Sequence, residues 1–443
     1  MKCIERLFLF LSFFPLLTMN AFADEPLGRR IVLDNGMILL LSEKHDIPMV
    51  TLSAAIGAGG VVEPADKPGL ASLTASLLMQ GTKTRTANEL SREIDFVGGS
   101  LSVSGGSDYA TAGLRVLKKD LNKGLALLSD VLMNPAFDQK EIDRRVKATL
   151  ADIQRRKEEP DSLASEAFAK AVFGGHPYGK TDDDVAAYLP KLKRADLADF
   201  YSSYYGPNNV VIAVVGDVGE QELVALLKES FKGWRPAAPA APAHPAPPKR
   251  EAATAIKIDK NVTQASIAMG HVGIDRSNPD YYAVMVMNYI LGGGGFSSRL
   301  MDNIRDNRGL AYDVHSSFAA QKEPGAFQIW IQTKNESANE AIAEAFKELR
   351  RAQTEPVTDK ELADAKAYIT GSFPLRLDTS AKIAGMLIAI ELHGLGLDYP
   401  QKYPGLINAV TRERVLQVAQ KYLHPDAMAI VVVANQEKAK LKY

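Results

Sequence analysis

The sequence is poor in cysteine, has no excess of either charge and contains no apolar run long enough for a comfortable membrane span. Its single cysteine, Cys3, lies at the start of the chain, so the remainder forms no disulfide and no cysteine-ligated metal site. The 52 Lys and Arg residues nearly balance the 53 Asp and Glu residues, for a net charge of −1. That balance gives no electrostatic reason to expect nucleic acid or an anionic membrane as a partner.

Several catalytic signatures are also absent. The chain has seven histidines, and no two are close enough in sequence to share a helix face, which excludes a His–His metal pair on one helix. There is no Gly-x-Ser-x-Gly elbow and no free catalytic cysteine, so the common patterns of serine and cysteine nucleophiles are missing. The one run of four glycines is not followed by Lys-Ser/Thr at P-loop spacing, and the first half has no dinucleotide fingerprint.

The N-terminus carries an export pattern. A basic start is followed by the apolar run LFLFLSFFPLL and by Ala21-Phe22-Ala23, a small-x-small cleavage site before Asp24. The run is short for a bilayer, which leaves an uncleaved anchor as the alternative. We predict a signal peptide over residues 1–23 and an exported mature protein without membrane attachment, periplasmic if the host is a Gram-negative bacterium.

The length and one low-complexity segment predict the domain organisation. A chain of 443 residues is too long for one hydrophobic core. The segment PAAPAAPAHPAPP, residues 236–248, builds no core and favours an extended form. We therefore predict an N-terminal domain over residues 24–235, a linker over 236–250 and a C-terminal domain over 251–443.

Helix and strand patterns occur in both parts of the chain, which indicates an α+β fold. Asn35-Gly36 between two apolar runs predicts a β-hairpin. The two parts also end alike, with RADLADFYSSYYGPNNVVIAVVGDV in the first and RERVLQVAQKYLHPDAMAIVVVANQ in the second. Each is a helix, a Tyr-containing turn, a proline and an apolar strand, with Pro207 matching Pro425. This predicts an internal repeat, although helix-turn-strand units are common enough for chance to be the alternative.

The most distinctive stretch is LGGGGFSSRLMDNIRDNRGLAYDVHSSF, residues 291–318. Its four glycines mark a sharp turn or a close approach of another backbone, and a helical run then leads into a strand. Arg305 and Tyr312 lie seven residues apart across the end of that helix, and they supply a forked cation and a polar hydroxyl. A helix cap followed by a strand, without a binding role, is the reading that the residues alone leave open.

This stretch closely resembles the signature of the C-terminal half in the insulinase/pitrilysin family of zinc peptidases. The resemblance covers nearly the whole chain after the signal peptide. It implies two similar α/β-roll halves, each a mostly antiparallel sheet flanked by helices, that form a clam-shell around a chamber. It also implies that Arg305 and Tyr312 reach across the chamber to the substrate.

The metal motif of that family is degenerate here. Active members carry His-x-x-Glu-His on the helix after Gly-Leu-Ala, where the two histidines bind zinc and the Glu activates water. Gly69-Leu70-Ala71 is present, but the three motif positions hold Ser72, Ala75 and Ser76, and the expected place of the third ligand holds Asp152. Asp152 alone is one weak carboxylate, more typical of a solvated helix face. We predict that this chain binds no metal and that zinc resides in a partner subunit.

The resemblance implies the non-catalytic subunit of an exported heterodimeric zinc endopeptidase. Tyr312 would hydrogen-bond the scissile carbonyl or the oxyanion, and Arg305 would bind a backbone carbonyl of the substrate. The other substrate-binding residues implied are Gly292, Gly293, Gly294, Gly295, Ser297 and Ser298. The expected partners are a zinc-bearing homologous subunit and peptides or unfolded protein segments, with no nucleic acid.

Two other functions remain open at this stage. A metal-free peptide-binding or scaffold protein of the same fold would bind peptides without cleavage in any combination. A self-sufficient zinc peptidase would need a metal site assembled from residues far apart in sequence, and its activity would be lost to chelators.

Overall fold

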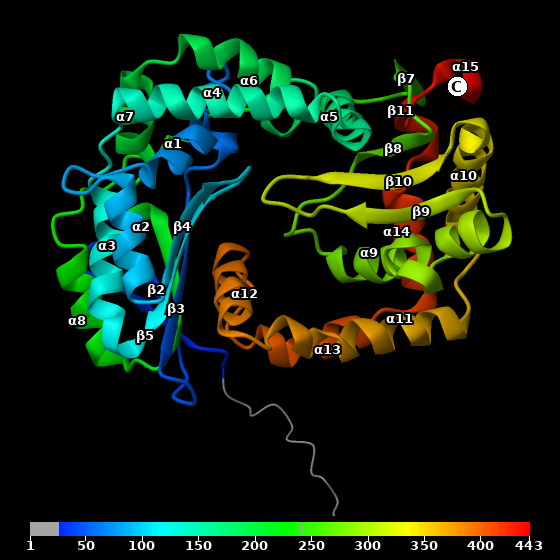
Figure 1. Ribbon diagram of the computed structural model, residues 1–443. Helices are drawn as coiled ribbons and strands as arrows, with labels where there is room; N and C mark the ends of the chain where they lie inside the picture. The colour runs from blue at the N-terminus through cyan, green and yellow to red at the C-terminus, as the bar shows by residue number, and fades with distance from the viewer. Residues whose placement is uncertain (1–25, 241) are drawn as a thin grey trace, which may run out of the picture.

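The structure, a computed structural model, describes residues 26–240 and 242–443, so the predicted signal peptide lies outside the described residues. The strands in this part of the chain form two sheets, and helices cover both (Figure 1). The predicted α+β class with two mostly antiparallel sheets flanked by helices is confirmed.

The first sheet has the spatial strand order β1-β2-β6-β3-β5-β4 in the described residues. Its strands are β1 (Arg29–Val32), β2 (Ile38–Glu43), β3 (Met49–Ile56), β4 (Ser100–Gly105), β5 (Ala110–Leu117) and β6 (Val210–Gly216). The predicted hairpin joins β1 to β2, and Gly36 supplies the positive φ of 87° at its turn. All neighbours are antiparallel except β2 and β6, which run parallel.

The second sheet repeats this arrangement with the order β7-β11-β8-β10-β9. Its described strands are β7 (Thr254–Asp259), β8 (Gln264–Val272), β9 (Ala311–Phe318), β10 (Ala326–Lys334) and β11 (Ala429–Ala434). Here β11 runs parallel to β7 and antiparallel to β8, as β6 does with β2 and β3. The predicted internal repeat is confirmed, because Pro207 and Pro425 each open a short 3-10 turn directly before the matching strand.

Helices pack on both sheets, and several begin at signals that the sequence carries. Thr86, Thr181 and Thr358 each cap a helix together with an acidic residue three positions on. The α-helices of the described residues are α1 (Leu70–Leu78), α2 (Ala87–Phe96), α3 (Leu121–Met133), α4 (Gln139–Arg156), α5 (Pro160–Phe173), α6 (Asp182–Tyr188), α7 (Arg194–Tyr204), α8 (Glu220–Ser230), α9 (Tyr281–Asn288), α10 (Ala338–Thr354), α11 (Asp359–Gly371), α12 (Ser380–Leu392), α13 (Tyr399–Asn408), α14 (Arg412–Tyr422) and α15 (Gln436–Ala439).

The two halves exchange helices. Helix α5 belongs to the first half by sequence, yet its Phe168 packs in a buried cluster with Ala268 and Val431 of the second sheet. Reciprocally, Leu387 of α12 packs in a buried cluster with Val211 and Val215 of the first sheet. Figure 1 shows α12 beside β3 and α5 beside β8. This exchange explains why β6 and β11 are buried on both faces.

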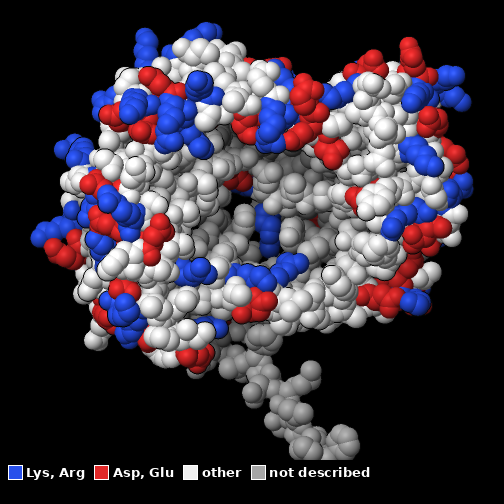
Figure 2. Space-filling model, in the orientation of Figure 1, with Lys and Arg blue, Asp and Glu red and all other residues white. Residues whose placement is uncertain are grey.

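Each exchanged helix covers only part of the inner face of the sheet it joins. On the first sheet the strands beyond α12 present small polar side chains, among them Ser102, Ser104 and Thr111. On the second sheet the strands beyond α5 present His315 and Trp330, which face each other across β9 and β10. Figure 2 shows the surface hollowed between the halves, with Lys and Arg side chains in the hollow.

Polar contacts also join the halves around this hollow. Arg30 of the first half forms a bidentate ion pair with Glu391 of the second half. Within the first half, the Tyr178 hydroxyl donates to Asp108 at 2.5 Å. Asp108 also accepts from the backbone N–H of Lys322, which lies between β9 and β10.

No helix in residues 26–240 or 242–443 has both the length and the apolarity needed to cross a membrane.

Candidate functional site

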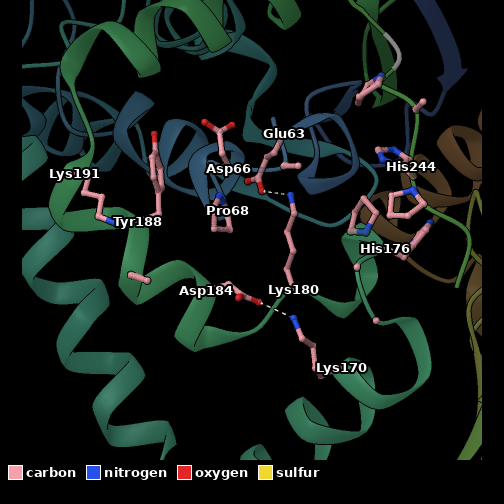
Figure 3. Close-up of a pocket in the computed structure, with 18 residues that line it drawn as sticks. Glu63, Asp66, Pro68, Lys170, His176, Lys180, Asp184, Tyr188, Lys191 and His244 are labelled. Carbon is pink, nitrogen blue, oxygen red and sulfur yellow. Dashed lines mark hydrogen bonds and ion pairs between the residues drawn. The ribbon is translucent and has the colours of Figure 1, made fainter. Parts of the chain in front are cut away.

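Helix α1 carries the positions of the degenerate metal motif, and the contacts around its N-terminus are intact although the motif residues themselves are replaced. Gly69 at its N-cap adopts φ of 84°, a conformation that favours glycine. The buried carboxylate of Glu63 accepts hydrogen bonds from the backbone N–H groups of Gly69 and Ala71 and pairs with Lys180 at 2.8 Å. Figure 3 shows Lys180 reaching Glu63. Burial raises the pKa of Glu63, and the nearby ammonium of Lys180 opposes that change.

The three motif positions lie on this helix next to the edge strand β4. Ser72 is exposed, Ala75 is fully buried and Ser76 is half-buried. The Ser76 hydroxyl donates to the carbonyl of Leu73 and accepts a hydrogen bond from Nε of Arg145 at 3.0 Å. Helix α1 and β4 approach so closely that a Cβ on Gly105 would lie 2.6 Å from Cα of Ser72.

Asp152 faces the same region from α4 and is ion-paired. Its carboxylate accepts from Arg155 at 2.7 Å and from Arg156 at 2.6 Å. The hydrogen bond from Arg155 lowers the pKa of Asp152, with the charge of Arg156 adding to the effect. Asp152 lines a cavity of about 480 Å³ together with Ser72, Ser76, Arg145, Thr149, Arg156, Asp182 and several apolar residues. The face of α4 that carries Asp152, for which the sequence favours a solvated position, forms one wall of this cavity.

This cavity does not fit zinc. Serine and alanine stand where the nitrogen and carboxylate ligands would be, the guanidinium of Arg145 bonds Ser76, and both oxygens of Asp152 are engaged by arginines. In the described parts of the chain, no group of three or more His, Cys, Asp or Glu side chains is placed to hold a metal ion.

The structure does bring together histidines that are distant in sequence. The rings of His176 and His244 lie 5.6 Å apart, and Glu323 contacts both. Nδ1 of His176 accepts from the backbone N–H of Tyr178, so its Nε2 carries the proton and donates to Glu323 at 2.8 Å. Nε2 of His176 therefore joins the halves through Glu323, while Nδ1 fixes the ring within the first half. The sequence gave no signal for this pairing across 147 residues.

Arg305 and Tyr312 belong to the second half. Strand β9 of that half and helix α1 of the first half lie on opposite sides of the molecule (Figure 1). Arg305 is in the π-helical turn η8 (Met301–Asn307), and Tyr312 is on the edge strand β9. Tyr312 sits at a β-bulge, since Ala311 pairs with Thr333 and Asp313 already pairs with Gln332. A bulge re-aims a side chain away from the regular strand pattern.

Both side chains are available to a ligand. Tyr312 is 71% exposed, and Arg305 is half-exposed with its guanidinium 4.7 Å from the ring centre of Phe296. Within the described residues neither side chain has a hydrogen bond or an ion pair. The predicted placement across a helix end and into a strand is confirmed, whereas their roles toward a substrate stay a prediction.

The predicted glycine and serine contacts have local explanations. A Cβ on Gly292 would lie 2.5 Å from Oγ of Ser316, so the close approach here is made by strand β9 of the same chain. Gly295 has φ of 58°. The hydroxyls of Ser297 and Ser298 donate to carbonyls of this loop, and Ser298 is fully buried. These residues shape the loop beside Arg305, and a direct contact of Gly292–Gly295, Ser297 or Ser298 with substrate stays a prediction.

A buried ion pair that the sequence did not reveal anchors this block. Arg299, 7% exposed, forms a bidentate pair with Glu361 of α11 at 2.6 and 3.0 Å. Burial alone would raise the pKa of Glu361, but the hydrogen bonds from Arg299 and Thr358 lower it to about 2. The pair fixes the start of η8, and with it the position of Arg305.

The comparisons with known proteins agree with this geometry. Residues 39–181 match the profile described as insulinase (peptidase family M16), and residues 191–369 match that of the peptidase M16 inactive domain. A crystal structure of a peptidase M16 inactive domain from Pseudomonas fluorescens has a TM-score of 0.85 at 30% identity, covering 92% of this chain and 98% of that chain. A protease from Helicobacter pylori has the same TM-score at 21% identity, covering 92% and 100%, which shows the shared fold.

Relatives by sequence point the same way. An uncharacterized zinc protease of Rickettsia bellii is 25% identical over 411 residues, 91% of this chain and 97% of its own length. An uncharacterized zinc protease of Mycobacterium tuberculosis is 28% identical over 420 residues, 93% of this chain and 94% of its own. With the profile matches and the Pseudomonas structure, these similarities confirm the resemblance carried by residues 291–318: the chain belongs to the insulinase family of peptidases, peptidase family M16.

Proposed function

We propose that this chain is the non-catalytic subunit of an exported heterodimeric zinc endopeptidase. A zinc-bearing homologous subunit supplies the metal, and this chain supplies Arg305 and Tyr312 for binding peptides or unfolded protein segments. One observation carries the proposal. The Arg305 and Tyr312 side chains are open and, within the described residues, unpaired, whereas the motif position Ser76 is hydrogen-bonded to an arginine.

The chemistry of the two side chains suits this role. The Tyr312 hydroxyl donates a hydrogen bond to the scissile carbonyl oxygen as negative charge develops on it, and the Arg305 guanidinium binds a second carbonyl of the substrate backbone. The neighbouring strand edges of β4 and β9 are unpaired within the described residues, and such edges bind extended peptides through main-chain hydrogen bonds. At the motif positions of α1, Ser72, Ala75 and Ser76 offer no carboxylate to activate water.

The test is cleavage of a quenched-peptide library by the mature chain, by a zinc-bearing family member from the same genome, and by the two together. Only the mixture, or the mixture far more than the zinc-bearing chain alone, is expected to cleave. Tyr312→Phe is then expected to lower kcat about 100-fold, since a single oxyanion donor contributes about 10²–10³, and Arg305→Ala is expected to raise KM. N-terminal sequencing of the exported protein is expected to begin at Asp24.

A matched control is Tyr368→Phe, which makes the same change at another exposed tyrosine, 60% exposed on α11. It should leave the mixture at full rate. If Tyr312→Phe and Arg305→Ala also do so, their assigned roles are wrong. Saturable peptide binding without cleavage in any mixture would favour a metal-free scaffold. Cleavage by the isolated chain that a chelator abolishes would mean that the chain holds a metal site of its own.

A further inference from the structure

The cavity beside α1 has the chemistry of an anion site in the place of a metal site. Its charged lining consists of two arginines and two aspartates, Arg145, Arg156, Asp152 and Asp182. Arg156 is fully engaged, since it donates to Asp182 through Nε and Nη2 and to Asp152 through Nη1. Asp182 is paired with Arg156, and Asp152 is paired with both Arg155 and Arg156, which weakens the repulsion of either carboxylate toward an anion.

Arg145 is the one cation of this lining that makes no ion pair with a described residue, although its charge is among those that lower the pKa of Asp152. Its Nε donates to Ser76, which holds the guanidinium plane against α1. Among the described residues its two terminal nitrogens have no hydrogen-bond partner, and no carboxylate lies within ion-pair distance. The hydroxyl of Ser72, exposed on the same wall, also has no partner in the described chain. A guanidinium with two free nitrogens fits the two oxygens of a carboxylate.

The surroundings favour a peptide as the source of that carboxylate. The unpaired guanidinium of Arg145 balances a single negative charge, which suits a carboxylate better than a phosphate dianion. Ser72 abuts Gly105 at the end of β4, and β4 is the edge of its sheet, paired with β5 alone in the described chain. A peptide that adds to this edge therefore has part of its length at the mouth of the cavity.

We propose that the cavity binds one carboxylate of an extended peptide, either its C-terminal carboxylate or an acidic side chain. Arg145 makes the bidentate contact, Ser72 donates a third hydrogen bond, and Ser76 positions Arg145. The family's metal position thus serves in this chain as an acidic-peptide site. This binding needs no zinc-bearing partner, so it can be tested independently of the proposed function.

The test is fluorescence anisotropy with the mature chain alone and labelled peptides of one uncharged extended sequence. The reference peptide is amidated and neutral, the second has a free C-terminal carboxylate, and the third is amidated with one central Glu in place of Gln. We expect one or both anionic peptides to bind about tenfold more tightly than the neutral one, as for a charge-assisted bidentate contact. Which of them does so identifies the source of the carboxylate.

Arg145→Gln is expected to remove this preference, so that the anionic peptides bind no more tightly than the neutral one. The matched control is Arg144→Gln, because Arg144 precedes it on α4 and bonds Glu141 and Gln80 outside the cavity. Arg145→Lys, which keeps the charge without the fork, should retain part of the preference, and circular dichroism checks that each variant is folded.

Three results would overturn the inference. One is equal binding of neutral and anionic peptides, or no saturable binding of either anionic peptide. Another is an equal loss of preference in Arg144→Gln and Arg145→Gln. The third is complete displacement of the anionic peptides by millimolar phosphate, which would make the cavity a site for inorganic anions.

Discussion

At the scale of single residues, the Arg299–Glu361 pair holds the block that carries Arg305. The folded pKa of Glu361, about 2, lies below its usual 4.5, so the pair stabilises the protein above about pH 5 and loses that effect as the pH falls toward 2. Glu361→Gln leaves a buried guanidinium without its counter-charge. We expect it to lower the free energy of unfolding by about 3 kcal/mol at pH 7. The difference in this free energy between variant and wild type should shrink as the pH falls. Urea denaturation at pH 7, 5, 4 and 3 measures this.

The control for that series is Glu355→Gln, which removes the same charge from an exposed pair with Arg351. Such pairs contribute about 0.5 kcal/mol or less, so its effect should be small at every pH. If the free energy of unfolding of Glu361→Gln differs from that of wild type by the same amount from pH 7 to pH 3, the ionised carboxylate of Glu361 is not the source of the stability.

The sequence could predict some of these residues and not others. Ser72, Ala75 and Ser76 stand at fixed spacing after Gly69-Leu70-Ala71, so the loss of the metal motif is visible in the sequence. Arg145 lies 69 residues from Ser76, in a highly charged helix with several arginines. No periodicity distinguishes the arginine that bonds Ser76 from the others on this helix.

At the scale of elements, α5 and α12 decide how the halves hold together. Phe168 of α5 is 3% exposed in the cluster with the second sheet. Phe168→Ala is expected to lower the free energy of unfolding by about 3–5 kcal/mol, as for other buried Phe→Ala changes. The same change at Phe96 of α2, which is 91% exposed, should have an effect within about 0.5 kcal/mol. Equal effects of the two variants in chemical denaturation would contradict the packing described for α5.

The helices and strands themselves follow from local patterns, but the exchange of helices does not. Helix α5 (Pro160–Phe173) follows from such a local pattern, with Pro160 at its first position. Its apolar residues show that one face is buried and do not show against which sheet. Tertiary packing selects one of the two similar sheets. The contacts that make this selection join residues more than 100 positions apart in sequence. Local sequence patterns therefore do not indicate which sheet a helix packs against.

At the scale of the whole molecule, the two halves form a ring around the hollow in Figure 2 and follow each other in sequence through the Pro/Ala segment. The internal repeat and the Pro/Ala segment allowed the sequence to predict two similar halves. The domain boundaries at residues 235 and 251 stay a prediction. The closed arrangement depends on α5, on α12 and on ion pairs such as Arg30–Glu391, to which the linker adds the contact of His244 with Glu323.

Cutting the linker therefore should not separate the halves. A site for a specific protease inserted after Ala238, which is exposed, allows the folded chain to be cleaved there. Because each half keeps an apolar helix buried against the sheet of the other, we expect the cut protein to elute as one particle of the uncut size in size-exclusion chromatography, and to separate only under denaturing conditions. Adding Phe168→Ala to the cut protein should lower the denaturant concentration at which the fragments part. Two half-sized particles without denaturant would mean that the linker, and not the exchanged helices, holds the ring together.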